Sequence, residues 1–76
     1  MTRVEFWHEG TRVASFHTQQ EAALTIEEGS TFKQAGAFWV VGQVVRDIET
    51  VEQHGAPAGI VVSDIRADVT PMGKQG

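Results

Sequence analysis

The sequence contains no cysteine, only one leucine and no long apolar run. Without cysteine the chain has neither a disulfide framework nor a thiolate metal site. Its longest apolar run, residues 37–41, falls far short of the roughly 20 residues that span a bilayer. The first ten residues carry charges and lack the apolar stretch of a signal peptide. These absences predict a soluble, cytoplasmic protein with no membrane partner.

Basic charge is also scarce. Ten acidic and six basic residues give a net charge of −4, the wrong sign for a protein that binds a nucleic-acid backbone. Basic residues flank an aromatic ring only where Arg3 and Arg12 lie on either side of Trp7, and Glu5 and Glu9 neutralise that cluster. We therefore expect no nucleic-acid partner.

The common motifs of catalysis and cofactor binding are missing as well. There is no Gly-x-Ser-x-Gly elbow, no Ser-x-x-Lys, no phosphate-binding glycine loop with lysine and no dinucleotide fingerprint. His8, His17 and His54 lack the spacing by which one element offers two metal ligands. The acidic residues Asp64 and Asp68 alternate with Arg66 in a pattern typical of a solvated strand face. The sequence thus assigns no catalytic residue, no cofactor and no metal, which favours a non-enzymatic protein.

What the chain has in quantity is β-branched residues: ten Val, four Ile and seven Thr. Such side chains lose rotamer freedom in a helix and pack well on pleated strands. A chain of 8.3 kDa forms one small domain that buries roughly 60% of its unfolded surface. We place this domain at residues 1–70, followed by a frayed tail at residues 71–76.

The first two strands are expected to form a hairpin around Glu9-Gly10. A two-residue loop pairs His8 with Thr11, whereas a three-residue loop with Gly10 in a left-handed bulge pairs Trp7 with Thr11. Because a slip of one residue inverts every side chain, the apolar pattern selects the register. The three-residue loop is favoured because it gathers four apolar residues on one face: Val4, Phe6, Ala14 and Phe16.

A helix is predicted after this hairpin. Thr18 and Glu21 have the spacing of a capping box, and Gly29 is a typical stop, which together predict a helix over residues 19–28. Residues 24–27 alternate in polarity, so a strand remains the alternative there. Strands are then expected at residues 30–32, 37–51 and 60–69.

These elements predict an α+β fold in the order β-β-α-(β)-β-β. The sheet is expected to be small and antiparallel, and to be able to curl into a small barrel. An all-β SH3-like barrel is the alternative. Gly42, in the middle of the long strand, indicates a bulge or a sharp bend.

The long strand, residues 37–51, has apolar residues on both faces, and this excess predicts a partner. A ten-residue helix covers only one face of the sheet, so either the sheet closes on itself or another chain covers the second face. The interface candidates are the uncovered residues of the long strand and one tryptophan that points away from the core: Trp39, Val41, Val45, Val51 and Trp7. We therefore expect a homodimer, or a complex with another protein.

Two functional interpretations remain open. The leading one is a non-enzymatic protein-interaction or self-association module. The alternative is a small ligand-binding or catalytic barrel with its site at an oligomer interface, where His17 or His54 would act. A pocket that combines a histidine with a carboxylate favours the second interpretation, and a flat apolar patch favours the first.

Overall fold

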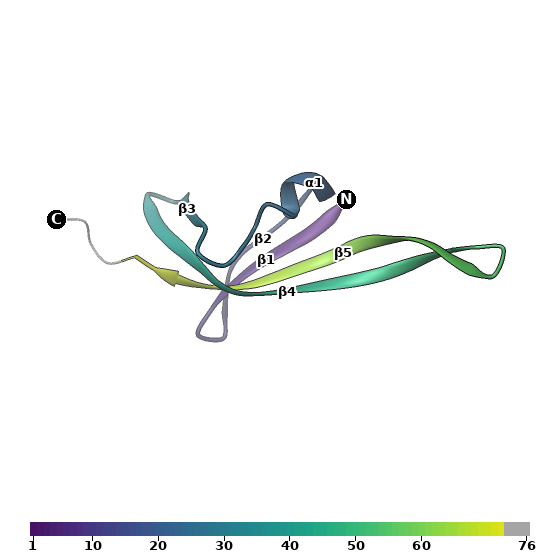
Figure 1. Cartoon of the computed structure of the whole chain (residues 1–76). Helices are drawn as coiled ribbons and strands as arrows, with labels where there is room; N and C mark the ends of the chain where they lie inside the picture. The colour runs from purple at the N-terminus through teal and green to yellow at the C-terminus, as the bar shows by residue number, and fades with distance from the viewer. Residues whose placement is uncertain (73–76) are drawn as a thin grey trace.

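The computed structural model describes residues 1–72, which form one curled sheet and one short helix (Figure 1). The elements are β1 (Thr2–His8), β2 (Thr11–Thr18), α1 (Gln20–Ala23), β3 (Thr31–Gln34), β4 (Ala37–Gln53) and β5 (Ala56–Pro71). The strand order in the sheet is β2-β1-β5-β4-β3. The sheet curls into a half-barrel, and α1 lies over its inner side near the start of β1 (Figure 1). The expectation of a small, barrel-like sheet is confirmed in this coarse form.

The finer parts of the predicted fold class are not shown. The sheet is mixed, because β1 pairs with β5 in parallel while its other pairings are antiparallel. The α+β description fits poorly, since α1 has four residues and the rest of the described structure is mostly sheet. Hairpins are encoded by local turn residues, but the β1–β5 pairing joins the two ends of the chain and has no local signal.

The first hairpin has the predicted faces but a different turn. Val4 pairs with Phe16 and Phe6 with Ala14, so these four residues share one face as expected. The turn itself has two residues, because His8 pairs with Thr11. A register shift between Phe6 and Trp7 leaves one extra residue in β2 and restores the apolar pairing. A two-residue turn and a bulge together thus produce the face that a three-residue loop was expected to produce.

All three hairpins use the same kind of turn. Glu9-Gly10, Ala35-Gly36 and His54-Gly55 each connect two antiparallel strands, and each has a positive φ at both residues. Type I′ turns require this conformation and match the twist of the strands that they join. Three non-glycine residues are thus held in the left-handed region, which is uncommon for such residues.

The helix predicted over residues 19–28 is wrong in length and in its cap. Thr18 is the last residue of β2 and pairs with Thr2, so its backbone belongs to the sheet. The N-cap position falls to Gln19, which makes no side-chain capping bond. The helix ends after Ala23, and Thr25 Oγ1 donates to the carbonyl of Ala22 at 2.6 Å in the turn that follows. The alternative of a strand over residues 24–27 is also wrong.

The core lies on the inner side of the half-barrel. Its buried apolar residues come from β1, α1, β4 and β5: Val4, Phe6, Ala23, Val41, Val62, Ile65, Ala67 and Val69. Partly buried residues pack against them: Val13, Ala14, Ile26, Phe32, Trp39 and Val44. This core is thin, as the chain length predicts, and half of its buried residues come from β5.

A bulge in β4 divides the apolar face that was predicted for the long strand. Val41 pairs with Val69 and Val44 with Ala67, so the register shifts across Gly42. Residues before and after the shift therefore alternate in opposite phase. The predicted common face of Trp39, Val41, Val45 and Val51 does not exist, because the first two lie on the inner side and the last two on the outer side.

The C-terminal part of β5 is longer than predicted. The strand continues to Pro71, and the amide of Met72 donates to the carbonyl of Phe38 at 2.9 Å. The expected frayed tail therefore does not begin at residue 71. The remainder of that tail, residues 73–76, lies outside the described residues.

At the opposite end, β4 and β5 extend well beyond the body as a two-stranded ribbon. This ribbon accounts for the elongated shape of the molecule, which measures 58 × 22 × 19 Å. In Figure 1 it projects away from β1, β2, β3 and α1. We define residues 48–61 as the arm.

Candidate functional site

The arm is the most exposed part of the described chain. Every residue from 48 to 61 is exposed, including those in strand positions. Four of its large β-branched residues have 41% or more of their surface open to solvent: Ile48, Val51, Ile60 and Val61. An isolated two-stranded ribbon is at best marginally stable in water, and apolar side chains on it gain nothing from that exposure. The arm is therefore a surface suited to a partner.

The strand pairing divides the arm into two sides. Ile48 pairs with the buried Val62, and Ile60 lies two residues before Val62, so both continue the core side of the sheet. We call this the inner side of the arm; it carries Ile48, Thr50, Glu52 and Ile60. The outer side of the arm carries Glu49, Val51 and Val61. Ile60, at 60% exposure, and Ile48, at 54%, make the inner side the more exposed apolar side.

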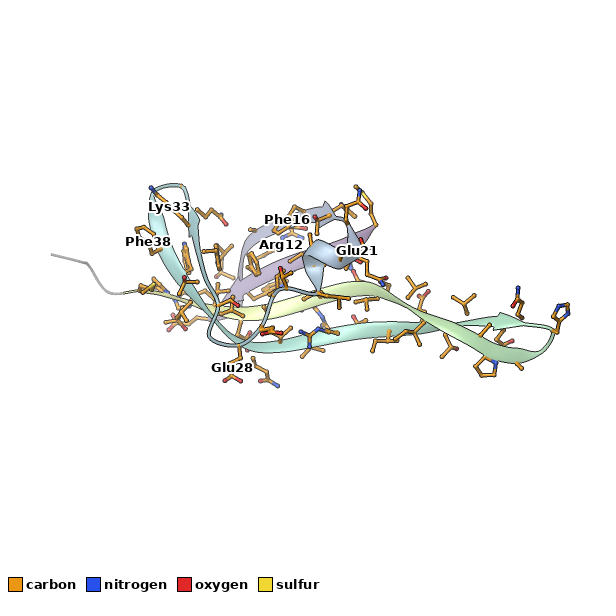
Figure 2. The ribbon with its side chains drawn as sticks, turned by 45° about the horizontal axis from the view of Figure 1, so that its top comes forward. Arg12, Phe16, Glu21, Glu28, Lys33 and Phe38 are labelled. Atoms are coloured by element: carbon orange, nitrogen blue, oxygen red, sulfur yellow. The ribbon has the colours of Figure 1, made fainter. Side chains whose placement is uncertain are left out.

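An apolar groove lies in the body between β2, α1 and β3. It has a volume of about 390 Å³, and its lining is largely aromatic and aliphatic: Phe6, Phe16, Thr18, Ala22, Ile26, Phe32, Lys33 and Gln34. Figure 2 shows Phe16 and Lys33 on β2 and β3, the two strands that flank it. Both are terminal strands of the sheet, so the groove is the open seam of the half-barrel.

Aromatic contacts build the floor of this groove. The ring of Phe6 stacks on that of Phe32 with centroids 4.5 Å apart, and Phe16 meets Phe6 edge-on at 5.8 Å. Gln34 Nε2 donates to the carbonyl of Val13 at 3.2 Å, which links the two terminal strands across the seam. A second pocket of about 310 Å³, which also includes Phe6 and Phe32, extends from this floor toward Val41. Packed rings and this hydrogen bond thus form the floor and one crossing of the seam.

Trp39 continues the aromatic row rather than lying on an exposed face. Its ring is nearly parallel to that of Phe32 at 6.4 Å, and His8 meets it edge-on at 5.8 Å. Its indole Nε1 is buried and has no hydrogen-bond partner among the described residues. Val41, with 3% exposure, is buried in the core. Val41 is therefore not available as an interface residue of the folded chain, whereas Trp39 is partly buried.

Trp7 and Val45 do come together, on the outer side of the sheet. Both line a depression of about 400 Å³ that also includes Glu5, Arg66 and Asp68. Trp7 Nε1 donates to Glu5 Oε1 at 3.4 Å. The sequence correctly placed Trp7 away from the core, and the structure surrounds it with charge.

Ion pairs cover much of this outer surface. Arg3 and Asp64 approach to 2.7 Å across the parallel pairing, and Arg66 lies 3.6 Å from Asp47. Arg12 lies 3.5 Å from Glu5, beside Trp7. Exposed pairs of this kind contribute little stability, but a partner that covered them would have to remove their water. The outer side is thus poorly suited to an apolar interface.

Sequence reasoning missed the inner side of the arm and the groove. Ile48 was not among the interface candidates, and Phe16 was placed on the apolar face of the first hairpin, whereas the structure exposes both. Gly42 was the available signal. When the alternation of side chains is counted afresh after a bulge at Gly42, Val45 and Val51 fall on the opposite side of the strand from Trp39 and Val41.

Side chains that could bind a metal ion do not gather in the described part of the chain. Within residues 1–72, no group of three or more His, Cys, Asp or Glu residues is placed to hold a metal ion. The three pockets described above include no histidine among their lining residues. Over the same range, no helix has the length and apolar character needed to cross a bilayer.

Comparison with known proteins gives no match: no protein-family model, no curated protein and no solved structure resembles this chain significantly. The arm, the groove and the charged outer surface are therefore the basis on which a function is proposed.

Proposed function

We propose that this chain is a non-enzymatic self-association module that forms a homodimer through its arm. The observation that carries the proposal is that every residue from 48 to 61 is exposed, including four large β-branched apolar side chains. A short, charged or covered edge is the usual protection of a sheet against unwanted pairing. The arm is long and uncovered, as expected of a segment that has a partner.

The energy available from covering the arm is substantial. Complete burial of a Val or Ile side chain contributes roughly 1.5–3 kcal/mol. The four arm residues keep about half of their surface exposed, so a partner would recover on the order of 3–6 kcal/mol from them. A domain of this kind has only about 5–15 kcal/mol of stability in total. Association therefore contributes on the same scale as folding.

The alternative function, a ligand-binding or catalytic barrel, has weaker support. The groove of about 390 Å³ is large enough for a small molecule. Its only ionisable lining residue is Lys33, and neither His17 nor His54 lies in it. Apolar walls without a histidine–carboxylate pair favour an interaction surface over an acid–base site.

Self-association is tested by the mass in solution. At about 100 µM, well above the dissociation constant of a micromolar dimer, light scattering should give twice 8.3 kDa. A variant with Ile48, Val51, Ile60 and Val61 all replaced by Thr keeps strand propensity but loses apolar surface, and it should give the mass of one chain. A wild-type mass of 8.3 kDa at that concentration would contradict the proposal.

A further inference from the structure

Trp7 borders a polar depression on the outer side of the sheet, which has no part in the proposed association through the arm. The depression has a volume of about 400 Å³, and its lining includes residues of β1, β4 and β5 but none of the arm. The parallel pairing of β1 with β5 places Glu5 opposite Arg66. In the same pairing Trp7 lies opposite Asp68. An indole ring, two carboxylates and one guanidinium thus border a single opening, which we call the outer depression.

The carboxylate of Glu5 is largely buried and has no close partner. Only 12% of this side chain is exposed. Among residues 1–72, its oxygens accept hydrogen bonds from Trp7 Nε1 at 3.4 Å and from Arg12 Nη1 at 3.5 Å. Charge-assisted hydrogen bonds to a carboxylate are ordinarily about 2.7–2.9 Å long, and a buried charge is costly without close partners. Glu5 can therefore accept a further cationic donor from the outer depression.

The one guanidinium in the lining is directed away from Glu5. Arg66 Nη2 lies 3.6 Å from Asp47 Oδ2 on β4, although Glu5 is the partner of Arg66 in the strand register. Asp68 makes no ion pair within residues 1–72. The lining thus holds two carboxylates against one guanidinium that is paired outside it. This excess of negative charge favours a cation over an anion as the ligand.

The indole ring of Trp7 supplies the apolar part of such a contact. Within the described range, the one cation–π contact joins Lys33 to Phe38, so no cationic side chain there lies over the ring of Trp7. Trp attracts cations more strongly than the other aromatic side chains, and aromatic rings are the usual receptors of quaternary ammonium groups. An organic ammonium ion combines a charge that the carboxylates attract with methyl or methylene groups that pack on the indole.

We infer that the outer depression binds an organic ammonium ion. The cationic group lies between the carboxylates of Glu5 and Asp68, and its methyl or methylene groups lie against Trp7. The depression shares no lining residue with the arm, so this site is independent of the proposed self-association. It also gives Trp7 a role outside the core that an apolar interface does not give it.

Nuclear magnetic resonance with tetramethylammonium chloride tests the site. The chain has two tryptophans, and in the ¹⁵N-labelled protein the indole N–H of Trp7 reports on the depression while the buried indole N–H of Trp39 is an internal control. The Trp7 signal should shift and saturate, with half-saturation at about 10 mM or below, and the Trp39 signal should not move. Neither tert-butanol, which is similar in size but uncharged, nor sodium chloride should give a saturating shift. A Trp7 shift that does not saturate, or that tert-butanol reproduces, would overturn the inference.

A matched pair of variants ties the shift to the outer depression. Asp68→Asn and Glu49→Gln each remove one negative charge from an exposed strand position, but only Asp68 lines the depression. Asp68→Asn should raise the half-saturation concentration by about threefold or more, and Glu49→Gln should change it by less than about twofold. Equal effects of the two variants would indicate attraction by the net charge of the chain and would contradict a site at Trp7.

Discussion

At the scale of single residues, the turns hold three residues with a Cβ in a backbone conformation that such residues rarely adopt. Glu9, Ala35 and His54 have φ values of 48°, 52° and 53°, in the left-handed region. Asn, Asp and His occupy this region several times more often than other residues with a Cβ. His54 therefore suits its turn, whereas Glu9 and Ala35 are strained there.

Relief of that strain should stabilise the protein. Ala35→Asn is expected to raise the free energy of unfolding by about 0.5–1 kcal/mol, because Asn tolerates the left-handed conformation better than Ala. Chemical denaturation followed by tryptophan fluorescence measures the change. Ala37→Asn, in the adjacent strand, is the control and should be neutral or destabilising. A loss of stability in Ala35→Asn would contradict the assignment of this turn.

At Gly10, in contrast, substitution is expected to destabilise the protein. Its φ is +79°, and a Cβ built there meets no atom within 4 Å, so any penalty of substitution comes from the backbone alone. Gly10→Val should lower the free energy of unfolding by about 1–2 kcal/mol, since a β-branched residue is strongly disfavoured at this φ. Gly10→Asn should cost clearly less in the same denaturation experiment. Equal midpoints for wild type and Gly10→Val would rule out the positive φ.

At the scale of the elements, α1 is held by its contacts rather than by its own sequence. Four residues are too few for a helix to be stable alone. Gln20 Oε1 accepts a hydrogen bond from the amide of Val62 at 3.1 Å, and Ala23 is buried against the core. These two contacts fasten the helix over β5 and the end of the groove.

The Gln20 contact gives a measurable prediction. Gln20→Ala should lower the free energy of unfolding by about 1–3 kcal/mol, because the amide of the buried Val62 loses its partner. The neighbouring Gln19→Ala, at an exposed position without a side-chain capping bond, should be nearly neutral. A neutral Gln20→Ala in thermal or chemical denaturation would show that α1 does not depend on this contact.

The elements also show how much of the fold could be predicted from the sequence. Turn glycines and alternating apolar residues were sufficient to predict the first hairpin face and the two long strands. The helix was overestimated because the spacing of Thr18 and Glu21 fits a capping box, yet Thr18 is committed to β2 by its pairing with Thr2. Tertiary contacts decide whether such a residue caps a helix or pairs in a strand, so a local sequence pattern does not reveal the outcome.

The candidate site was predicted less well than the fold. An excess of apolar strand faces predicted an uncovered apolar surface, and the structure does expose apolar residues, but the residues assigned to that surface belong to two different sides of the sheet. The bulge at Gly42 reverses the phase of alternation, and the position of a bulge depends on the partner strand. The exposure of Ile48 and Ile60 depends on β1, β2 and β3 ending short of the arm, which is a property of the assembled sheet (Figure 1).

At the scale of the whole molecule, the structure combines a small packed body with a long two-stranded ribbon that no other element covers. The body has an open apolar seam, and the ribbon has apolar residues without cover. Each feature would be a liability in a lone chain, since exposed strands and apolar patches promote unspecific association. A partner over the arm, as proposed, would remove the larger of the two exposed apolar surfaces from water.

Hydrogen exchange measured at two protein concentrations tests this account most directly, because it uses the unmodified chain and reports on the arm itself. At about 1 µM the amides of residues 48–61 should exchange rapidly, and at about 100 µM they should become protected as dimers form. Protection that depends on concentration should be absent around Trp7 on the outer side. Exchange rates in the arm that do not depend on concentration would contradict self-association through the arm.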